Sequence, residues 1–353
     1  MISKIDKNFI QNQADKDTFW IDANSELFNL YGLFYDNKEG QFVRVPSEIA
    51  KSISDGISYL STNTAGGRIT FRTNSTNICI KCSFKNNGIM AHMPIVGSNG
   101  FSVYVNGKFY SKFAPAWTKF NDGEIITYDA ETTIRGEQEI RDIKIYFPLY
   151  SGICEFFIGV DKNAVIEKGT PYKCEKPIVY YGSSITQGGC ASRPGNDYPS
   201  HIERWLNCNF VNLGFSGSAK GELEIADYII SLNPSVVVMD YDYNAPSKEF
   251  LDQTHYPFYK RIRDALPSTP IVFISLPDFY NNVKVSEERR AVIYNTYLKS
   301  VEQGDKLTSF IDGETLFGKE DYDACTVDGT HPNDLGFYRM AKVICPVIEK
   351  FIK

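Results

Sequence analysis

The chain has 353 residues, of which 42% are hydrophobic and 23% are charged, as in globular proteins that bury a substantial core. Its formal net charge is −6, and it contains no long run of Lys or Arg. Nucleic acid and anionic membranes, which need a basic surface, are therefore not expected as partners. The length exceeds that of one average domain and predicts two.

The first twenty residues lack the apolar stretch of a secretory signal. No segment approaches the 18 consecutive apolar residues of a membrane-spanning helix. The eight cysteines have scattered spacings, and only Cys79 and Cys82 lie close together, without the second ligand pair that a zinc site requires. We therefore expect a cytoplasmic protein with free, mostly buried thiols and with no metal or organic cofactor.

The first half of the chain has the pattern of antiparallel β-structure. Turn residues separate short segments rich in β-branched and aromatic residues, namely TFWIDA, RITFRTNS, NICIKCSF, FSVYVNGKFY, EIITYDA, IRDIKIYF and CEFFIGV. The Asn106-Gly107 pair in FSVYVNGKFY indicates a type I′ hairpin. These features predict a jelly-roll-like β-sandwich over residues 1–165.

After a linker with two prolines at 161–177, apolar strands alternate with helices. The predicted strands are 177–182, 209–214, 235–241, 270–276 and 308–313, and the predicted helices are 196–207, 221–232, 248–265, 286–302 and 333–352. Continuously apolar strands of this kind form parallel sheets with helices on both faces. We expect a three-layer α/β/α domain over residues 166–353, with its ligand beyond the carboxyl ends of the strands.

Candidate catalytic residues follow three of these strands and precede the last helix. Ser184 follows the first strand in GSSITQG, NLGFSGS ends the second, Asn244 follows the third, and DGTHPN precedes the helix. An Asp three residues before a His can bind the imidazole Nδ1–H, which leaves Nε2 of His331 to accept the Ser184 proton. Each segment alone also fits a plain turn or a helix cap, but four in this order indicate one site.

These segments resemble the sequence blocks of the SGNH/GDSL hydrolases, a family named for its Ser, Gly, Asn and His. The resemblance covers about residues 177–353, and GGRITFRTNS and GSNGFSVYV resemble the N-terminal sandwich of a bacterial two-domain subgroup. It implies a catalytic triad of Ser184, Asp328 and His331. It also implies an oxyanion hole formed by the N–H groups of Ser184 and Gly217 and the side chain of Asn244.

Two positions depart from the family pattern. The usual Asp before the nucleophile is Ser183, and the usual Gly two residues before the Asn is Asp242. The first change removes a common orienting carboxylate but no member of the triad. The second places an acidic side chain near the oxyanion site, where it either binds a sugar hydroxyl or faces solvent.

The resemblance also suggests a class of substrate. Similar two-domain enzymes include carbohydrate O-acetylesterases, and the strand-end loops CASRPGND, YDYNAPS and PDFYNN are polar and aromatic. The leading hypothesis is a serine esterase that removes O-acetyl groups from an acetylated sugar or oligosaccharide through an acyl-enzyme. The alternatives are a lipase- or thioesterase-like hydrolase of longer acyl chains and a non-catalytic carbohydrate-binding protein.

Four other reactive side chains remain to be assigned. His92 lies in the long sandwich loop 85–100, which can reach across the domain boundary, so it is either a substrate contact or a surface histidine. Cys190 follows the proposed nucleophile closely but has no basic neighbour in the sequence, and we assign it to packing. His201 and His255 lie in helix-like segments and are expected to be structural or exposed.

Overall fold

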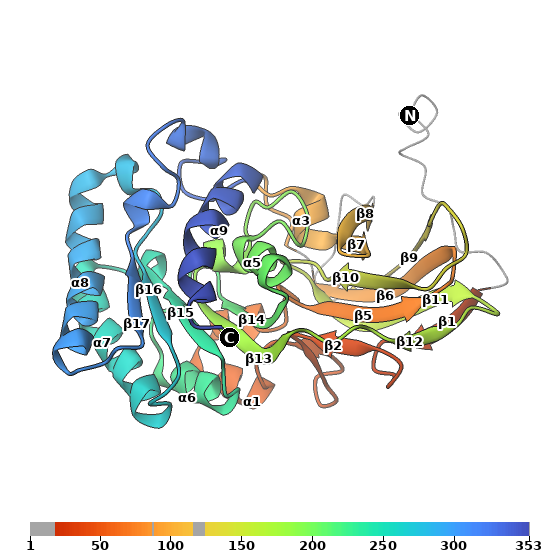
Figure 1. Ribbon diagram of the computed structural model, residues 1–353, viewed down its shortest axis with the longest axis horizontal. Helices are drawn as coiled ribbons and strands as arrows, with labels where there is room; N and C mark the ends of the chain where they lie inside the picture. The colour runs from red at the N-terminus through yellow and green to blue at the C-terminus, as the bar shows by residue number, and fades with distance from the viewer. Residues whose placement is uncertain (1–17, 87, 116–123, 353) are drawn as a thin grey trace.

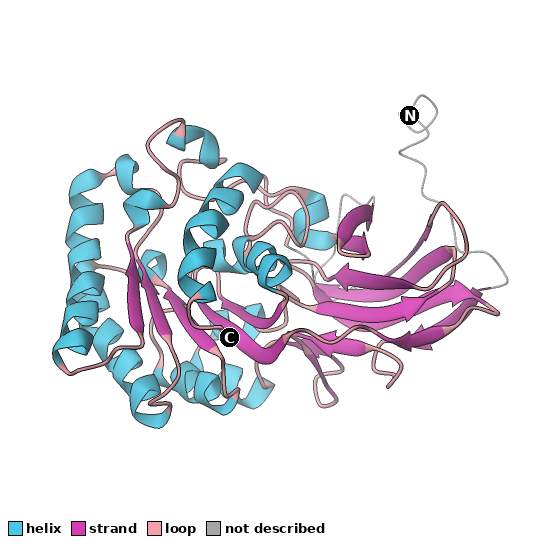
Figure 2. Ribbon diagram, in the orientation of Figure 1, coloured by secondary structure: helices cyan, strands magenta, loops and turns pink. Residues whose placement is uncertain are grey.

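The computed structural model describes residues 18–86, 88–115 and 124–352. Antiparallel sheets from the first half of the chain and a helix-covered parallel sheet from the second half lie side by side along its long axis (Figure 1, Figure 2). Within these residues, no helix has the length and apolar character needed to cross a membrane.

The first half forms two antiparallel sheets that enclose one apolar core. The first sheet has the order β1 (Thr18–Asp22), β11 (Gly152–Asp161), β6 (Asn77–Asn86) and β9 (Ile126–Thr133). The second has the order β12 (Ile166–Lys168), β5 (Arg68–Thr73), β10 (Arg141–Tyr146), β7 (Phe101–Val105) and β8 (Lys108–Phe113), with β2 (Asn29–Tyr31) also on β5. Because Ile80 of one sheet and Ile145 of the other belong to the same buried cluster, the sheets form a sandwich.

The predicted β segments all contain strands of this sandwich. Asn106 and Gly107 have φ values of 49° and 77° between β7 and β8, as a type I′ turn requires. In this part of the chain, the elements that were not predicted are the hairpin β3 (Phe34–Asp36) and β4 (Gln41–Val43), the strands β2 and β12, and the helices α1 (Ser47–Ile53), α2 (Asp55–Leu60) and α3 (Ile95–Asn99). These elements have three to seven residues, too few to establish a periodic pattern.

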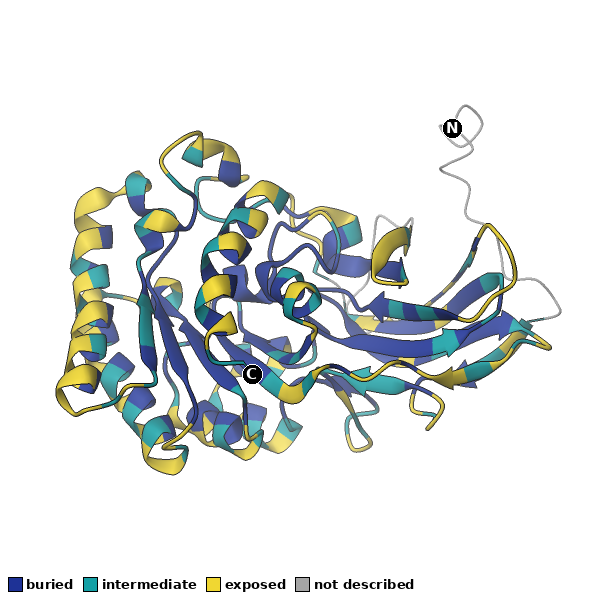
Figure 3. Ribbon diagram, in the orientation of Figure 1, coloured by how far each residue is buried: buried dark blue, intermediate teal, exposed yellow. Residues whose placement is uncertain are grey.

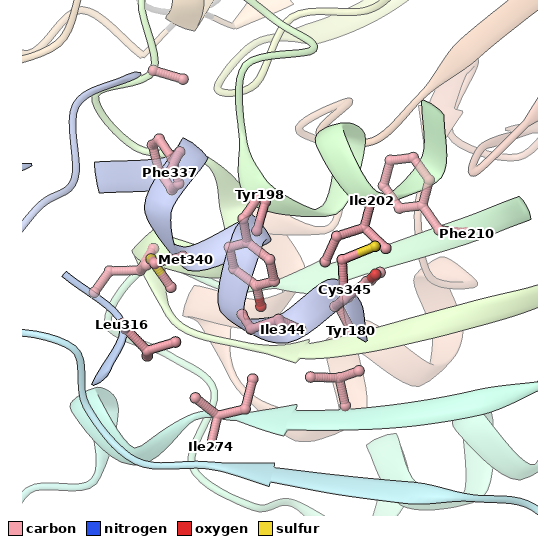
Figure 4. Close-up of a cluster of buried hydrophobic side chains, with 14 of the residues drawn as sticks. Tyr180, Tyr198, Ile202, Phe210, Ile274, Leu316, Phe337, Met340, Ile344 and Cys345 are labelled. Atoms are coloured by element: carbon pink, nitrogen blue, oxygen red, sulfur yellow. The ribbon is translucent and has the colours of Figure 1, made fainter. Parts of the chain in front are cut away.

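The second half forms the predicted three-layer domain. Its parallel sheet has the order β14 (Cys208–Gly214), β13 (Cys174–Gly182), β15 (Val236–Asp240), β16 (Ile271–Ile274) and β17 (Thr308–Ile311). Side chains of β13 alternate between the two faces. Tyr180 packs with α5 (Tyr198–Leu206) and α9 (Asp334–Glu349), as Figure 4 shows, whereas Tyr181 packs with α6 (Leu223–Ser231), α7 (Lys248–Ala265) and α8 (Val283–Glu302).

The sandwich half also contributes side chains to the cores of the second domain. Ile57 of α2 belongs to the cluster on the Tyr181 face, and Leu149 belongs to the cluster on the Tyr180 face. Buried residues run through the strands of both halves, and exposed ones lie on the outer faces of the helices, on β8 and in the loops (Figure 3). The boundary expected at residue 165 lies between β11 and β12, although β12 still pairs with β5, so this division into folding units stays a prediction.

Buried charges cross the junction between the two halves. Arg68 of β5 donates to the Tyr172 hydroxyl (2.7 Å), to the Phe210 carbonyl (3.1 Å) and to Asn209 Oδ1 (2.6 Å). Glu203 of α5 accepts hydrogen bonds from Lys144 and Tyr146 of β10 and from the Tyr172 hydroxyl (2.6 Å). Hydrogen-bonded charges therefore join the domains, in addition to the apolar contacts.

The eight cysteines are all free, and seven of them are buried, with Cys174 partly exposed. Burial raises the pKa of Cys79 and of Cys345 to about 11 in each case. These thiols are therefore neutral packing groups near pH 7. The prediction of free, mostly buried thiols is confirmed.

Candidate active site

The candidate site lies where three neighbouring strands of the parallel sheet end. Gly182 at the end of β13 is in register with Gly214 of β14 on one side and with Asp240 of β15 on the other. Ser184, Gly217 and Asn244 follow these three strand ends by two to four residues. They therefore start from one edge of the sheet, at the point where the strand order reverses.

A tight turn presents Ser184 between β13 and the short helix α4 (Ser184–Gln187). The Ser183 hydroxyl accepts a hydrogen bond from the Ile185 N–H (3.1 Å) and caps this helix. A Cβ on Gly182 would lie 2.0 Å from Thr186 Oγ1 and 2.5 Å from the Asp240 carbonyl. Only glycine fits where the strand turns into the helix.

Ser184, His331 and Asp328 form one hydrogen-bonded chain. Ser184 Oγ lies 3.0 Å from His331 Nε2, and His331 Nδ1 lies 2.7 Å from Asp328 Oδ2. Ser184 is only 5% exposed, whereas the Asp328 side chain lies at the surface. The structure thus brings together three residues separated by up to 147 positions, in the order that proton transfer from serine to histidine requires.

The loop that carries Asp328 and His331 holds the carboxylate in its ionised form. Asp328 Oδ1 accepts hydrogen bonds from the backbone N–H groups of His331 (2.7 Å) and Thr330 (3.0 Å). Desolvation would raise the pKa of Asp328, but these bonds and the bond to the His331 ring outweigh it and lower the pKa. An ionised Asp328 fixes the imidazole tautomer that leaves Nε2 facing Ser184.

Gly217 and Asn244 lie in loops that are bonded to each other. Gly217 has a φ of 66° in the turn after β14, and a Cβ there would meet no atom within 4 Å. Asn244 ends the short helix η3 (Asp242–Asn244), and its side-chain amide donates to the Phe215 carbonyl (2.8 Å). One amide hydrogen of Asn244 is used in this way and the other remains for a ligand. The role of both residues as oxyanion donors stays a prediction.

Comparison with known proteins identifies the family. The sequence profile of the GDSL-like lipase/acylhydrolase family matches residues 175–349, and the profile for the N-terminus of SGNH-hydrolase-type esterases matches residues 18–166. A crystal structure described as a GDSL-like lipase from Bacteroides ovatus is 30% identical, with a TM-score of 0.82 over 95% of this chain and 98% of that one. The chain belongs to the GDSL/SGNH hydrolase family. It is a carboxylic ester hydrolase with the sandwich and parallel-sheet domains of this family.

Two structures of lower sequence identity share the fold. A salicylyl-acyltransferase from a tetracycline biosynthetic pathway is 17% identical, with a TM-score of 0.74 over 94% of this chain and 96% of its own. An acetyl xylan esterase from Butyrivibrio proteoclasticus is 12% identical, with a TM-score of 0.58 over 95% of this chain and 100% of its own. No curated protein matches the sequence.

The structure accounts for both departures from the GDSL/SGNH pattern. Ser183 caps α4, a role that Asp and Ser fill equally well. Asp242 is 1% exposed, its Oδ1 accepts from Arg289 Nε (2.7 Å), and its Oδ2 accepts from the Leu276 N–H (3.0 Å). The expectation that Asp242 binds a sugar hydroxyl or faces solvent is therefore wrong, because a carboxylate buried here is stable only with its charge paired.

The sandwich loop reaches His331, as its length suggested. The ring centroids of His92 and His331 are 5.3 Å apart, and a Cβ on Gly97 of α3 would lie 2.1 Å from the Ala191 carbonyl. His92 is thus beside the site rather than on a remote surface. His201 and His255 are elsewhere and bond to Arg204 and Thr296 (3.0 Å each), and burial lowers the pKa of each to about 3. Of the two alternatives expected for them, structural or exposed, these contacts favour the structural one.

Two residues that support the site were not found from the sequence. Gln187 of α4 donates to Asn63 Oδ1 and to the Leu149 carbonyl (3.1 Å each), and its Oε1 accepts from the Ser216 N–H (3.1 Å). Arg44, 1% exposed, donates to the Gly214 carbonyl (2.7 Å) at the end of β14. The sandwich half thus fixes the loops around Ser184. The one signal for this was an Arg within the apolar run QFVRVP.

Proposed function

We propose that this hydrolase removes O-acetyl groups from acetylated sugars or oligosaccharides, with Ser184, His331 and Asp328 as its catalytic triad. The observation that carries the proposal is the chain of short contacts from Ser184 Oγ to His331 (3.0 Å) and from His331 to Asp328 (2.7 Å). Family membership supports the reaction class, which is hydrolysis of a carboxylic ester.

The mechanism follows from the positions of these atoms. Ser184 Oγ attacks the acetyl carbonyl carbon while His331 Nε2 accepts the hydroxyl proton, and the carbonyl oxygen becomes an oxyanion. Collapse of this intermediate breaks the bond to the sugar oxygen, which takes the proton from His331. A water molecule, deprotonated by His331, then attacks the acetyl-enzyme, and acetate leaves as Ser184 regains its proton. Asp328 stabilises the imidazolium in both halves of the reaction.

The oxyanion is assigned to the N–H groups of Ser184 and Gly217 and to the Asn244 amide. The adjacent strand ends and the bond from Asn244 to Phe215 support this assignment. Donors fixed before the reaction stabilise the charge that develops on the carbonyl oxygen, and each contributes about 3 kcal/mol to transition-state stabilisation.

The rim of the site supports a carbohydrate substrate. Tyr243 is 36% exposed beside Asn244, and its hydroxyl bonds to Thr330 Oγ1 (2.7 Å) next to His331. An exposed tyrosine ring among hydroxyl and amide groups suits the apolar face and the hydroxyls of a sugar. A known acetyl xylan esterase has the same fold, which is consistent with the proposal.

Acetate release from acetylated xylan, acetylated mannan and simple sugar acetates tests the substrate assignment. We expect release from at least one of these substrates, and faster cleavage of nitrophenyl acetate than of nitrophenyl decanoate. Ser184→Ala should abolish both activities. Cleavage of long-chain esters alone, by a parent enzyme that depends on Ser184, would instead assign the protein to the lipase- or thioesterase-like class.

A further inference from the structure

Three side chains of types that can ligate a metal ion lie close together beside Ser184. One potential ligand atom from each of His92, Cys190 and His331 lies within 4.8 Å of the other two. The residues come from the sandwich loop, from the loop after α4 and from the loop before α9. The fold alone brings them together, since no two lie within 90 positions of each other in the sequence.

His331 is already oriented as a metal ligand would be. Its Nδ1 is bonded to Asp328 Oδ2 (2.7 Å), so its Nε2 carries the lone pair, which faces the Ser184 hydroxyl at 3.0 Å. A carboxylate that holds one imidazole nitrogen while the other binds the ion is the usual arrangement around histidine ligands of zinc. The negative charge of Asp328 also favours a cation at this position.

Cys190 is held in place by the nucleophile loop. The N–H groups of Gly188 and Gly189 donate to the Ser184 carbonyl (3.1 and 2.9 Å), and Cys190 follows with a φ of 73°. Burial, and to a smaller extent the charge of Asp328, raises the pKa of the Cys190 thiol to about 12. The thiol is therefore neutral and unreactive on its own, and a bound cation would displace its proton.

We propose that His92, Cys190 and His331 form a binding site for Zn²⁺ that inhibits the enzyme reversibly. Two imidazole nitrogens and a thiolate are a donor set that suits Zn²⁺ and leaves a fourth tetrahedral position for water or the Ser184 hydroxyl. Bonds of about 2.0–2.3 Å in a tetrahedral site require the three ligand atoms to lie about 3.5 Å from one another. Their present separations of up to 4.8 Å must therefore shorten by at most about 1.3 Å, through rotation of the side chains. The ion binds the lone pair of His331 Nε2, which must accept the Ser184 proton during catalysis. The metal-bound enzyme is therefore inactive.

The first test is inhibition of ester hydrolysis, and this arm alone rests on the proposed function. Zn²⁺ should inhibit the parent enzyme, EDTA should restore its activity, and Mg²⁺, which prefers oxygen ligands, should have no effect. Cys190→Ser should keep the metal-free activity within about twofold and raise the half-inhibitory Zn²⁺ concentration at least about tenfold. Cys174→Ser, which changes a partly exposed thiol outside the cluster, is the matched control and should behave as the parent does.

The second test does not depend on catalysis. Co²⁺ added to the parent protein should give the near-ultraviolet charge-transfer absorption of a cobalt–thiolate bond, and Zn²⁺ should displace it. The absorption should be absent in Cys190→Ser, weakened in His92→Gln and retained in Cys174→Ser. An absorption that persists in Cys190→Ser, or equal zinc inhibition of that variant and the parent, would overturn the proposal. A cobalt signal in a protein without esterase activity would leave the metal site standing and refute the proposed function.

Discussion

The candidate active site, at the ends of β13, β14 and β15, and the junction between the two halves of the chain both contain polar side chains. The two regions differ in how completely these side chains are hydrogen-bonded. At the junction, Arg68 and Glu203 are fully buried. Every buried polar side-chain atom of these two residues has a hydrogen-bond partner within the described part of the chain. At the active-site edge, Ser184 and Asn244 keep hydrogen-bonding capacity for a ligand. The polar side chains at the junction therefore hold the two halves together, whereas those at the strand ends are available for the proposed reaction.

This difference predicts two separable kinds of variant. Changes at the strand ends should remove activity with little effect on stability, because Ser184 is small and uncharged and Asn244 is only partly buried. Changes at the junction should lower stability, because they leave a buried charge without a partner. A variant that lost both properties together would show that the two regions are one cooperative unit.

The largest effect is expected for Asp328→Asn. The amide can no longer hold the imidazole in the tautomer that accepts the Ser184 proton, so kcat should fall about 10⁴-fold. The melting temperature should change little, because Asp328 lies at the surface. Asp323→Asn, an exposed aspartate in the preceding segment, provides the control and should keep the parent's kcat.

The next largest effect is expected at the junction, for Glu203→Gln. Loss of this charge leaves Lys144 and Arg68 without their buried counter-charge, so the free energy of unfolding should fall by about 3–5 kcal/mol. Denaturant unfolding measures the change. Glu167→Gln removes an exposed ion pair with Arg72 and should cost at most about 1 kcal/mol. Equal losses in the two variants would refute the distinction between buried and exposed pairs.

Asn244→Ala tests the oxyanion assignment at the edge. Loss of one donor should lower kcat about 10²- to 10³-fold and leave KM nearly unchanged, because the donor acts on the transition state. Steady-state kinetics measures kcat and KM separately. A rise in KM at unchanged kcat would mean that Asn244 binds the substrate and does not stabilise the oxyanion.

A smaller effect concerns the pH dependence of stability. Burial raises the pKa of Asp240 to about 7, despite hydrogen bonds from Thr186 and Tyr198. Between the unfolded pKa near 4 and the folded pKa, the folded state holds a proton that the unfolded state has lost. Asp240 should therefore make stability fall by about 1 kcal/mol per pH unit as the pH rises from about 5 to 7. The free energy of unfolding of Asp240→Asn should lack this decline between about pH 5 and 7. An equal decline with pH in the variant and the parent would rule out Asp240 as its cause.

Much of the fold could be predicted because the periodic patterns are long. The predicted helix 248–265 coincides with α7, and the predicted strand 177–182 lies within β13. The order of the motifs at the strand ends also indicated which residues would meet, since parallel strands end at one edge.

Contacts between distant segments could not be predicted in this way. Arg44 bonds to Gly214 and Asp242 pairs with Arg289 through tertiary packing, and neither contact leaves a periodic signal. The same holds for the approach of His92 and Cys190 to His331. Sequence therefore predicted which candidate catalytic residues would meet, but not the tertiary contacts that hold their loops in place.

Labelling with a fluorophosphonate tests the central claim, that His331 activates Ser184, most directly. Mass spectrometry of the intact parent should show one adduct per chain, on the peptide that contains Ser184. The adduct should be absent in Ser184→Ala and should form far more slowly in His331→Ala, although both variants fold. Labelling of Ser184→Ala at the parent's rate would contradict the account, because the reactive nucleophile would then lie elsewhere.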